Sequence, residues 1–167
     1  FCDADDIWKK NKLSDQISYM RKNNLNFSHT SYSVIDKNSR NIGSFTIKEK
    51  LSYKNLIKSC DIGLSTVIAK KKIFSKNKFP SLKTKEDYQL WLKILKKTKF
   101  LFGMNKKLSS WRLADNSLSS SFTQRVSDSF KLYNKYEKYN IILSFFFVLR
   151  LSYFALLKKI QIYFVKG

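Results

Sequence analysis

The segment at residues 1–8 reads Phe-Cys-Asp-Ala-Asp-Asp-Ile-Trp, and its acidic cluster is the strongest signal in the chain. We expect the first two residues to end a strand, so that Asp3, Asp5 and Asp6 lie in the following loop. Carboxylates this close repel one another unless a cation neutralises them. Hard divalent ions prefer oxygen ligands, and Mg²⁺ commonly also binds phosphate oxygens. The segment therefore predicts either a divalent-cation site or an acidic turn before a helix.

The rest of the chain alternates patterns typical of helices and strands. Apolar spacing predicts a helix over residues 10–24, with Leu13, Ile17 and Met20 on its buried face, and further helices over 53–59 and 123–138. Another helix begins after Thr84, its N-cap, and ends near Lys97. Strands are expected over 26–35, 44–48, 64–69, 99–102 and 107–113. This alternation favours an α/β layered domain over residues 1–122, followed by a helical extension over 123–167.

Residues 139–157 are almost wholly apolar, and their number approaches the roughly 20 residues that span a bilayer. Arg150 lies near the middle, where a charge costs about 2.5 to 3.5 kcal/mol on insertion scales. Three arrangements are open: a helix in the membrane interface, a helix packed on another part of the protein, or a true span. We favour the interfacial helix, with Arg150 and Lys158 extending to the lipid headgroups.

The chain is strongly basic, with 33 Lys and Arg against 12 Asp and Glu and a formal net charge of +21. This charge raises the possibility of nucleic-acid binding. However, only five of the cations are Arg, the residue on which specific base and phosphate recognition depends, and the lysines are scattered along the chain. Attraction to an anionic membrane explains the charge at least as well, and we expect no nucleic-acid partner. The two cysteines and one histidine form no zinc-type ligand spacing.

Two further segments carry residues suited to chemistry. The run Lys85-Glu86-Asp87-Tyr88 precedes Trp91 at the start of a predicted helix, where a carboxylate is either a partner of the helix dipole or a functional group. The segment Trp111-Arg112-Leu113 is followed by Asn-Ser-Leu-Ser at residues 116–119. An Arg beside hydroxyl groups fits either phosphate or sugar binding or an ordinary polar turn.

Taken in order, these segments resemble the central and C-terminal parts of family 2 glycosyltransferases of the GT-A fold, most closely the bacterial enzymes that build surface polysaccharide. The resemblance is carried by residues 1–16, 27–32, 61–67, 85–91 and 111–119, and covers roughly residues 1–138. It implies an α/β chain with a partial GT-A fold. The N-terminal strands that hold the nucleotide in this family are absent from the sequence, and we expect them to precede Phe1.

The resemblance also implies roles on the donor side of a site. Asp3 and Asp5 match the metal-binding Asp-x-Asp motif of the family, whose ion would be Mn²⁺ or Mg²⁺ and whose donor is a nucleotide sugar, most commonly a UDP-sugar. Asp3 and Asp6 would also contact the donor, and Arg112 would lie near its diphosphate.

On the acceptor side, Asp87 falls where the family places its general base, with Glu86 beside it and Trp91 as a further substrate contact. The acceptor would be a saccharide or a lipid-linked saccharide, and a lone base implies direct displacement with inversion. The expected location is the cytoplasm, at the inner face of the cytoplasmic membrane.

The sequence leaves two alternatives to an active glycosyltransferase. The abrupt start and the apolar tail fit a truncated, non-catalytic remnant or a membrane-associated module from a split gene. The charge keeps a basic nucleic-acid binder open, which would show tight binding with a steep salt dependence.

Overall fold

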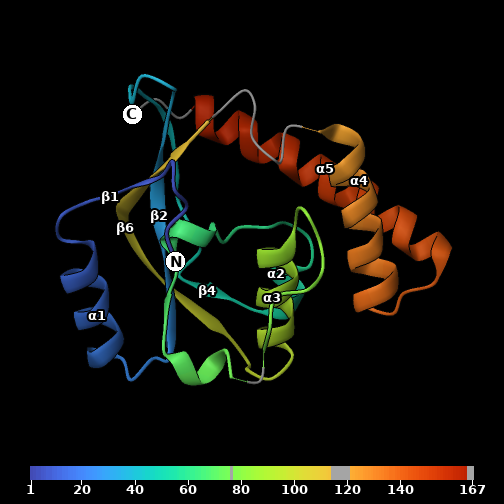
Figure 1. Cartoon of the computed structure of the whole chain (residues 1–167), viewed down its shortest axis with the longest axis horizontal. Coiled ribbons are helices and arrows are strands. Elements are labelled where there is room, and N and C mark those ends of the chain that lie inside the picture. The colour runs from blue at the N-terminus through green and yellow to red at the C-terminus, as the bar shows by residue number, and fades with distance from the viewer. Residues whose placement is uncertain (76, 114–120, 165–167) are drawn as a thin grey trace.

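The computed structural model describes residues 1–75, 77–113 and 121–164, which form a mixed α/β fold (Figure 1). The strands are β1 (Ile7–Trp8), β2 (Phe27–Ile35), β3 (Asn41–Phe45), β4 (Lys50–Leu51), β5 (Ile68–Ala69) and β6 (Leu101–Arg112). The α-helices are α1 (Lys12–Lys22), α2 (Tyr53–Leu56), α3 (Glu86–Leu95), α4 (Phe122–Lys131) and α5 (Ile141–Phe164). Two 3₁₀ turns, η1 (Leu64–Thr66) and η2 (Lys71–Ile73), and a π-helical turn, η3 (Leu132–Tyr136), complete the described elements.

The six strands form one sheet with the order β1-β6-β2-β3, in which β4 also pairs with β6 and β5 with β2. Only β2 and β6 are parallel among these pairs. The prediction of two short strands separated near Gly103 was wrong, because β6 is continuous over 12 residues. Gly103 serves close packing instead of a turn, since a Cβ there would lie 2.8 Å from the His29 ring.

Residues 64–69 also differ from the predicted strand, because only Ile68 and Ala69 pair with β2. The first half forms η1, in which the Thr66 hydroxyl donates to the Gly63 carbonyl at 2.7 Å. Side-chain hydroxyls that bond to nearby backbone compete with strand pairing in this way. The predicted strand at 44–48 lies slightly earlier, as β3.

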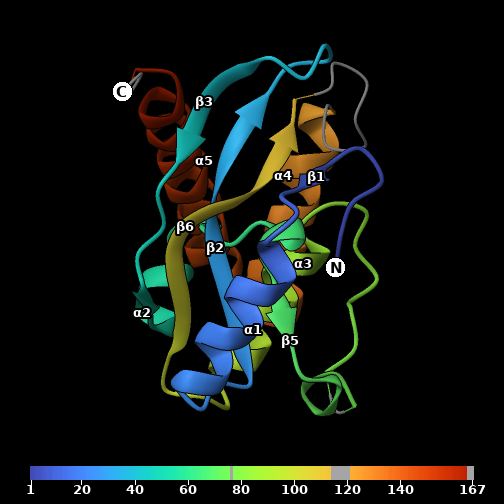
Figure 2. The ribbon, with the colours of Figure 1, turned by 90° about the vertical axis from the view of Figure 1, so that its left-hand side faces the viewer.

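Helix α1 covers one face of the sheet, and α2, α3 and α5 lie on the other (Figures 1 and 2). The buried face of α1 is rotated from the predicted one. Lys12 and Gln16 are fully buried with Met20, whereas Leu13 and Ile17 are 49% and 37% exposed. The cause is a set of hydrogen bonds from Lys12 and Gln16, described with the site below.

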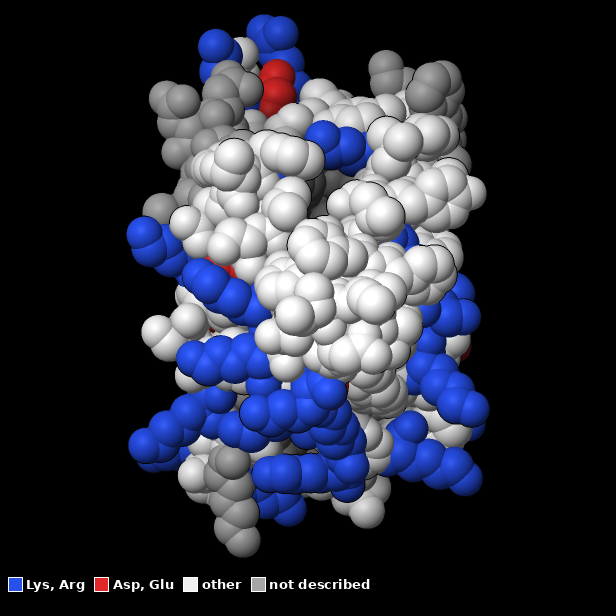
Figure 3. Space-filling model, turned by 90° about the vertical axis from the view of Figure 1, so that its right-hand side faces the viewer, with Lys and Arg blue, Asp and Glu red and all other residues white. Residues whose placement is uncertain are grey.

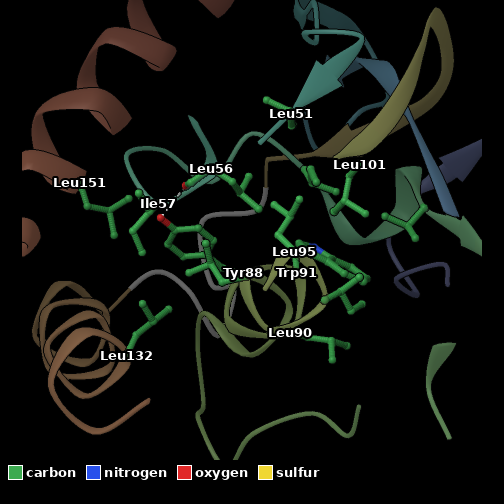
Figure 4. Packing of buried hydrophobic residues seen from close by; sticks show 14 of the residues in the cluster. Leu51, Leu56, Ile57, Tyr88, Leu90, Trp91, Leu95, Leu101, Leu132 and Leu151 are labelled. Carbon is green, nitrogen blue, oxygen red and sulfur yellow. Dashed lines mark hydrogen bonds between the residues drawn. The ribbon is translucent and has the colours of Figure 1, made fainter. Parts of the chain in front are cut away.

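The predicted apolar stripe of α3 is confirmed, since Tyr88, Trp91, Leu92 and Leu95 are all buried. In Figure 4 this helix packs against Leu56 and Ile57 at the end of α2, with Leu132 and Leu151 closing the core. Leu132 lies in η3 and Leu151 in α5, so the core continues across the boundary predicted at residue 122. The helical extension thus packs as part of the same layered structure.

One side of α5 lies along the domain. Its buried positions Ser144, Val148, Leu151 and Ile162 follow helical spacing. A Cβ on Gly43 of β3 would overlap the Ile162 backbone, so the strand and helix are in close contact.

The prediction that Arg150 and Lys158 extend to lipid headgroups was wrong. Arg150 donates to the Ile57 carbonyl at 3.1 Å, and Lys158 donates to the Cys60 carbonyl at 2.8 Å. Lys158 thus satisfies the Cys60 carbonyl, and Arg150 is a second donor to the Ile57 carbonyl, which also accepts a hydrogen bond from the Tyr133 hydroxyl at 3.1 Å.

The other side of α5 is an exposed apolar face. Positions spaced by four and three residues carry large apolar side chains that are 46% to 83% exposed, namely Ile142, Phe146, Leu149, Tyr153, Leu156 and Ile160. By length and composition alone, Ile141–Tyr163 could cross a membrane. Figure 3 shows a broad band of uncharged side chains on this side of the molecule, with Lys and Arg gathered beside and below it.

Candidate functional site

The N-terminal segment is held by aromatic contacts and not by strand pairing, so the expected strand end at Phe1 and Cys2 is wrong. The Phe1 ring lies 5.2 Å from Phe74, 5.7 Å from Phe79 and 6.3 Å from Trp91, in edge-to-face geometry. Such aromatic pairs add to the free energy gained by burying apolar area. The acidic cluster therefore forms a turn between this aromatic anchor and β1, with the Asp6 amide donating to the Asp3 carbonyl.

Ser65 of η1 links the acidic cluster to the rest of the domain. Its hydroxyl accepts a hydrogen bond from the Asp3 amide at 2.9 Å, and its carbonyl accepts one from the Trp8 indole at 2.8 Å. The 3₁₀ turn that replaced the predicted strand is thus the support on which the cluster rests.

A network of buried hydrogen bonds, formed by Lys12, Gln16 and Ser28, holds η1 in place. The Lys12 ammonium donates to Gln16 at 2.7 Å and to the Thr66 carbonyl at 3.1 Å. The Gln16 amide donates to the same carbonyl at 3.0 Å and to both oxygens of Ser28. Burial lowers the pKa of Lys12 to about 8. Buried polar groups that are all paired in this way fix a single geometry.

Arg112 occupies the other side of the acidic cluster. Its amide donates to the Asp6 carboxylate at 2.9 Å, and its Nε donates to the Asp5 carbonyl at 2.8 Å. Its Nη1 donates to the carbonyls of Asp36 and Lys37 and to the Ser39 hydroxyl. The side chain thus ties the cluster to the β2–β3 turn, which gives it a positioning role apart from any contact with a phosphate.

Electrostatics around the cluster disfavour the charged carboxylates. Burial raises the pKa of Asp3, and the nearby charge of Asp5 raises it further, although a hydrogen bond from Ser65 opposes both effects. Burial also raises the pKa of Asp6, against hydrogen bonds from Ser65 and the Arg112 amide. Carboxylates in this state gain from a nearby cation.

Asp3 and Asp5 are the residues of the cluster that could contribute to a metal site shared with a substrate phosphate. Among the described residues, no group of three or more His, Cys, Asp or Glu side chains is placed to hold a metal alone. Asp3 and Asp5 are both exposed residues of the turn, and Asp3 is shielded on one side by Ser65. One or two carboxylates together with substrate phosphates are the usual protein environment of Mg²⁺.

Asp87 lies at the start of α3, one helical turn before Trp91, whose ring lies 6.3 Å from that of Phe1. Lys85, just before the helix, adopts the left-handed conformation with φ 71°, which is uncommon for a residue other than glycine. Burial raises the pKa of Asp87 to about 6, opposed by the Tyr88 amide and reinforced by the charges of Glu86 and Asp3. The Tyr88 amide donates to Asp87 at 2.6 Å. The chain thus places a carboxylate of raised pKa beside the acidic cluster.

Asp128 of α4 positions the loop that leads to Asp87, a role that the sequence did not reveal. Its Oδ2 accepts hydrogen bonds from the Thr84 amide at 2.8 Å, the Thr84 hydroxyl at 3.1 Å and the Lys83 amide at 3.2 Å. The prediction of Thr84 as the N-cap of α3 is therefore wrong, since Lys85 occupies that position and Thr84 bonds to α4. A lone Asp in a polar helix gives no local signal of such a contact.

The remaining predicted site residues have mixed placements. Glu86 lies next to Asp87, and one of its carboxylate oxygens is buried without a hydrogen-bond partner among the described residues. Trp91 is fully buried, 5.2 Å from the Phe27 ring, so it lies in the core, and its role as a substrate contact stays a prediction. The residues at 116–119 lie outside the described part of the chain.

Known proteins resemble this chain over most of its length. It is 41% identical over 122 residues to the Escherichia coli UDP-Glc:alpha-D-GlcNAc-diphosphoundecaprenol beta-1,3-glucosyltransferase WfgD, covering 72% of this chain and 47% of WfgD. It is 32% identical over 139 residues to Bacillus subtilis (strain 168) TuaG, named as a glycosyltransferase of teichuronic acid biosynthesis, covering 83% of this chain and 55% of TuaG. This chain is a homologue of bacterial glycosyltransferases.

A third glycosyltransferase, an uncharacterized protein of Haemophilus influenzae (strain ATCC 51907 / DSM 11121 / KW20 / Rd), is 28% identical over 159 residues, covering 95% of this chain and 63% of that protein. The chain spans about half the length of WfgD and TuaG. No protein-family model matches it. The relationship confirms the resemblance to bacterial surface-polysaccharide glycosyltransferases and leaves the roles of the individual site residues as predictions.

Proposed function

We propose that this glycosyltransferase homologue is part of a family 2 enzyme with the GT-A fold, acting in the synthesis of a bacterial surface polysaccharide. The observation that carries the proposal is the packing of the N-terminal acidic segment against α3: the Phe1 ring lies 6.3 Å from that of Trp91, one helical turn after Asp87, and the charge of Asp3 raises the pKa of Asp87. The mixed sheet, with β2 and β6 parallel and helices on both faces, supports a partial GT-A fold. The name of WfgD states UDP-Glc as donor and a diphosphoundecaprenol-linked GlcNAc as acceptor, so we take a UDP-sugar and a lipid-linked saccharide as the substrates.

Asp87 is the proposed general base. It accepts the proton of the acceptor hydroxyl while the hydroxyl oxygen bonds to the anomeric carbon of the donor. The bond from that carbon to the diphosphate breaks, and the diphosphate leaves with the electron pair. A single displacement of this kind inverts the anomeric configuration. The charge of Glu86 helps to keep the pKa of Asp87 high, which makes its carboxylate a better proton acceptor.

Asp3 and Asp5 are the proposed ligands of a Mn²⁺ or Mg²⁺ ion that is shared with the donor diphosphate. Such an ion neutralises negative charge on the leaving group. The protein's own contribution is to hold the two carboxylates in place, through Ser65 below the cluster and Arg112 beside it.

Binding of UDP by calorimetry, with and without Mn²⁺, tests the donor side of this proposal. We expect binding that requires Mn²⁺ and is lost in Asp5→Asn. Glu49→Gln removes an exposed carboxylate away from the cluster and should leave binding unchanged. Absence of Mn²⁺-dependent binding by this chain together with the N-terminal strands expected to precede Phe1 would contradict the proposal and support the alternative of a non-catalytic module.

We also propose that the exposed face of α5 rests on the anionic inner face of the cytoplasmic membrane. Because the opposite side of α5 is anchored to the domain through Leu151, Arg150 and Lys158, the helix lies in the plane of the interface and does not cross the bilayer. The apolar stripe would enter the acyl boundary, while lysines such as Lys135 and Lys138, exposed in the segment before α5, contact the headgroups.

Cosedimentation with lipid vesicles tests this surface. Binding to phosphatidylglycerol vesicles should exceed binding to phosphatidylcholine vesicles and weaken with salt. Replacing Phe146 and Leu149 by Ser should abolish it. Failure of the wild-type protein to bind either vesicle would overturn the membrane proposal and favour another protein segment as the cover of this face.

A further inference from the structure

A pocket of about 380 Å³ lies between the segment after β3, the end of α2 and the second half of α5. Three cations line it, Lys48, Lys58 and Lys158, against a single carboxylate, Asp61. The Ser59 hydroxyl donates to that carboxylate at 2.6 Å, which occupies one of its oxygens. The pocket therefore carries a net positive charge and suits an anionic ligand.

The cations of the pocket differ in mobility. Lys158 is held in place, since its ammonium donates to the Cys60 carbonyl at 2.8 Å and lies 4.1 Å from the centroid of the Phe45 ring. Lys48 and Lys58 are exposed and free to turn towards a ligand. A fixed charge at the back with two movable charges at the mouth suits a ligand that carries several anionic oxygens.

The rest of the wall combines the polar side chains of Thr46, Asn55 and Gln161 with apolar side chains, two of which come from α5. Phe154 and Leu157 line the pocket, and Leu156, next in the chain, belongs to the exposed apolar stripe. A ligand in the pocket can thus contact cations at one end and continue over an apolar surface at the other.

The pocket adjoins the segment against which the start of α3 packs: the Tyr88 hydroxyl, next to Asp87 in the chain, donates to the Leu56 carbonyl at 2.8 Å, and the nearby Asn55 and Lys58 line the pocket. Burial raises the pKa of the Cys60 thiol to about 12; the charge of Asp87 raises it further, and the charge of Lys158 opposes this increase. Cys60 stands between Ser59 and Asp61 of the pocket wall. The start of α3, which carries the proposed base, therefore packs against the same segment that lines the basic pocket.

We infer that this pocket binds the diphosphate of a lipid-linked acceptor, with its hydrocarbon chain leaving along the apolar face of α5. The identity of the acceptor rests on the proposed function, whereas the anionic and apolar chemistry of the pocket stands on the structure. Among the described residues that line the pocket, Asp61 is the one carboxylate that would repel an anionic ligand.

Binding of farnesyl diphosphate, inorganic pyrophosphate and UDP, measured by calorimetry, tests the site without requiring catalysis. The double change Lys48→Gln and Lys58→Gln should weaken farnesyl diphosphate binding about tenfold or more, as expected for lost charge-assisted hydrogen bonds. Lys54→Gln is the matched control, because Lys54 is exposed on α2 and does not line the pocket. Leu157→Ser should weaken farnesyl diphosphate binding and leave pyrophosphate binding unchanged.

Two results would overturn the inference: equal farnesyl diphosphate affinity in the double variant and the wild type, or displacement of farnesyl diphosphate by UDP. The second would assign the pocket to the nucleotide. A transfer assay separates this inference from the proposed function. If sugar transfer occurs but the double variant leaves the KM for a lipid diphosphate acceptor unchanged, the pocket assignment fails alone. If farnesyl diphosphate binds as expected but no transfer is found, the proposed function fails alone.

Discussion

The acidic cluster and α5 are held to the same domain by opposite kinds of contact. Apart from the aromatic contacts of Phe1, the cluster is held by hydrogen bonds, from the Ser65 and Arg112 links to the buried pair Lys12 and Gln16. Along α5 the contacts are mainly apolar. Hydrogen bonds fix directions to within a narrow range, whereas apolar packing gives stability without direction. The site therefore depends on the directions of its hydrogen bonds, whereas the attachment of α5 depends on the apolar area that it buries.

The largest expected effect on stability is the difference between substitutions on the buried and on the exposed side of α5. Leu151→Ala should lower the free energy of unfolding by about 2–5 kcal/mol, because it leaves a cavity in the shared core. Leu149→Ala, on the same helix but 70% exposed, should change it by less than about 0.5 kcal/mol. Urea unfolding measures both, and equal losses would contradict the placement of α5.

A smaller loss is expected beneath the acidic cluster. Gln16→Leu should lower the free energy of unfolding by about 1–3 kcal/mol, because the Lys12 ammonium and the Thr66 carbonyl each lose a buried hydrogen-bond partner. Ser18→Ala, on the exposed side of α1, provides the control and should have little effect. If Gln16→Leu were as stable as Ser18→Ala, the network would have no role in holding η1.

The raised pKa of Asp87 predicts that both the transfer rate and the stability depend on pH. Only ionised Asp87 accepts a proton, so the transfer rate should fall about tenfold per pH unit below about 6. Stability has the opposite sign: the folded chain binds this proton more tightly than the unfolded chain, so the stabilisation present below pH 3.8 is lost as pH rises through 6. Glu86, Lys85 and Asp3 are the charged groups that act on Asp87.

Glu86→Gln sharpens this prediction. Removal of its charge should move the acid limb of the rate profile to lower pH, since that charge raises the pKa of Asp87. If the acid limb of the rate profile did not move, the charge of Glu86 would have no effect on the pKa of Asp87. The pH–rate profiles of both proteins provide the measurement.

The sequence predicted those features that depend on local pattern. Tyr88, Trp91 and Leu95 share one side of a helix because of their spacing, and they are buried as expected. The acidic cluster and the start of α3 were also picked out, although their roles stay predictions. The α1 face was mispredicted because Lys12 and Gln16 are buried by hydrogen bonds to distant backbone, which apolar periodicity does not register.

Contacts between distant elements could not be predicted from the sequence for the same reason. Asp128 supports Thr84 across 44 residues of chain, and Arg112 bonds to carbonyls of the β2–β3 turn. Both side chains look like ordinary surface residues in the sequence. Arg150 and Lys158 resembled snorkelling cations for the same reason, and only the fold shows that carbonyls of the domain accept their hydrogen bonds.

The most direct test of the account is sugar transfer by Asp87→Asn, measured with UDP-glucose and a GlcNAc-diphospho-lipid acceptor beside Mn²⁺-dependent UDP binding. The substitution keeps the shape of the side chain and removes its ability to accept a proton. We predict that transfer falls about 10²- to 10⁴-fold while UDP binding is unchanged. Transfer within a few-fold of the wild type would contradict the assignment of Asp87 as the general base.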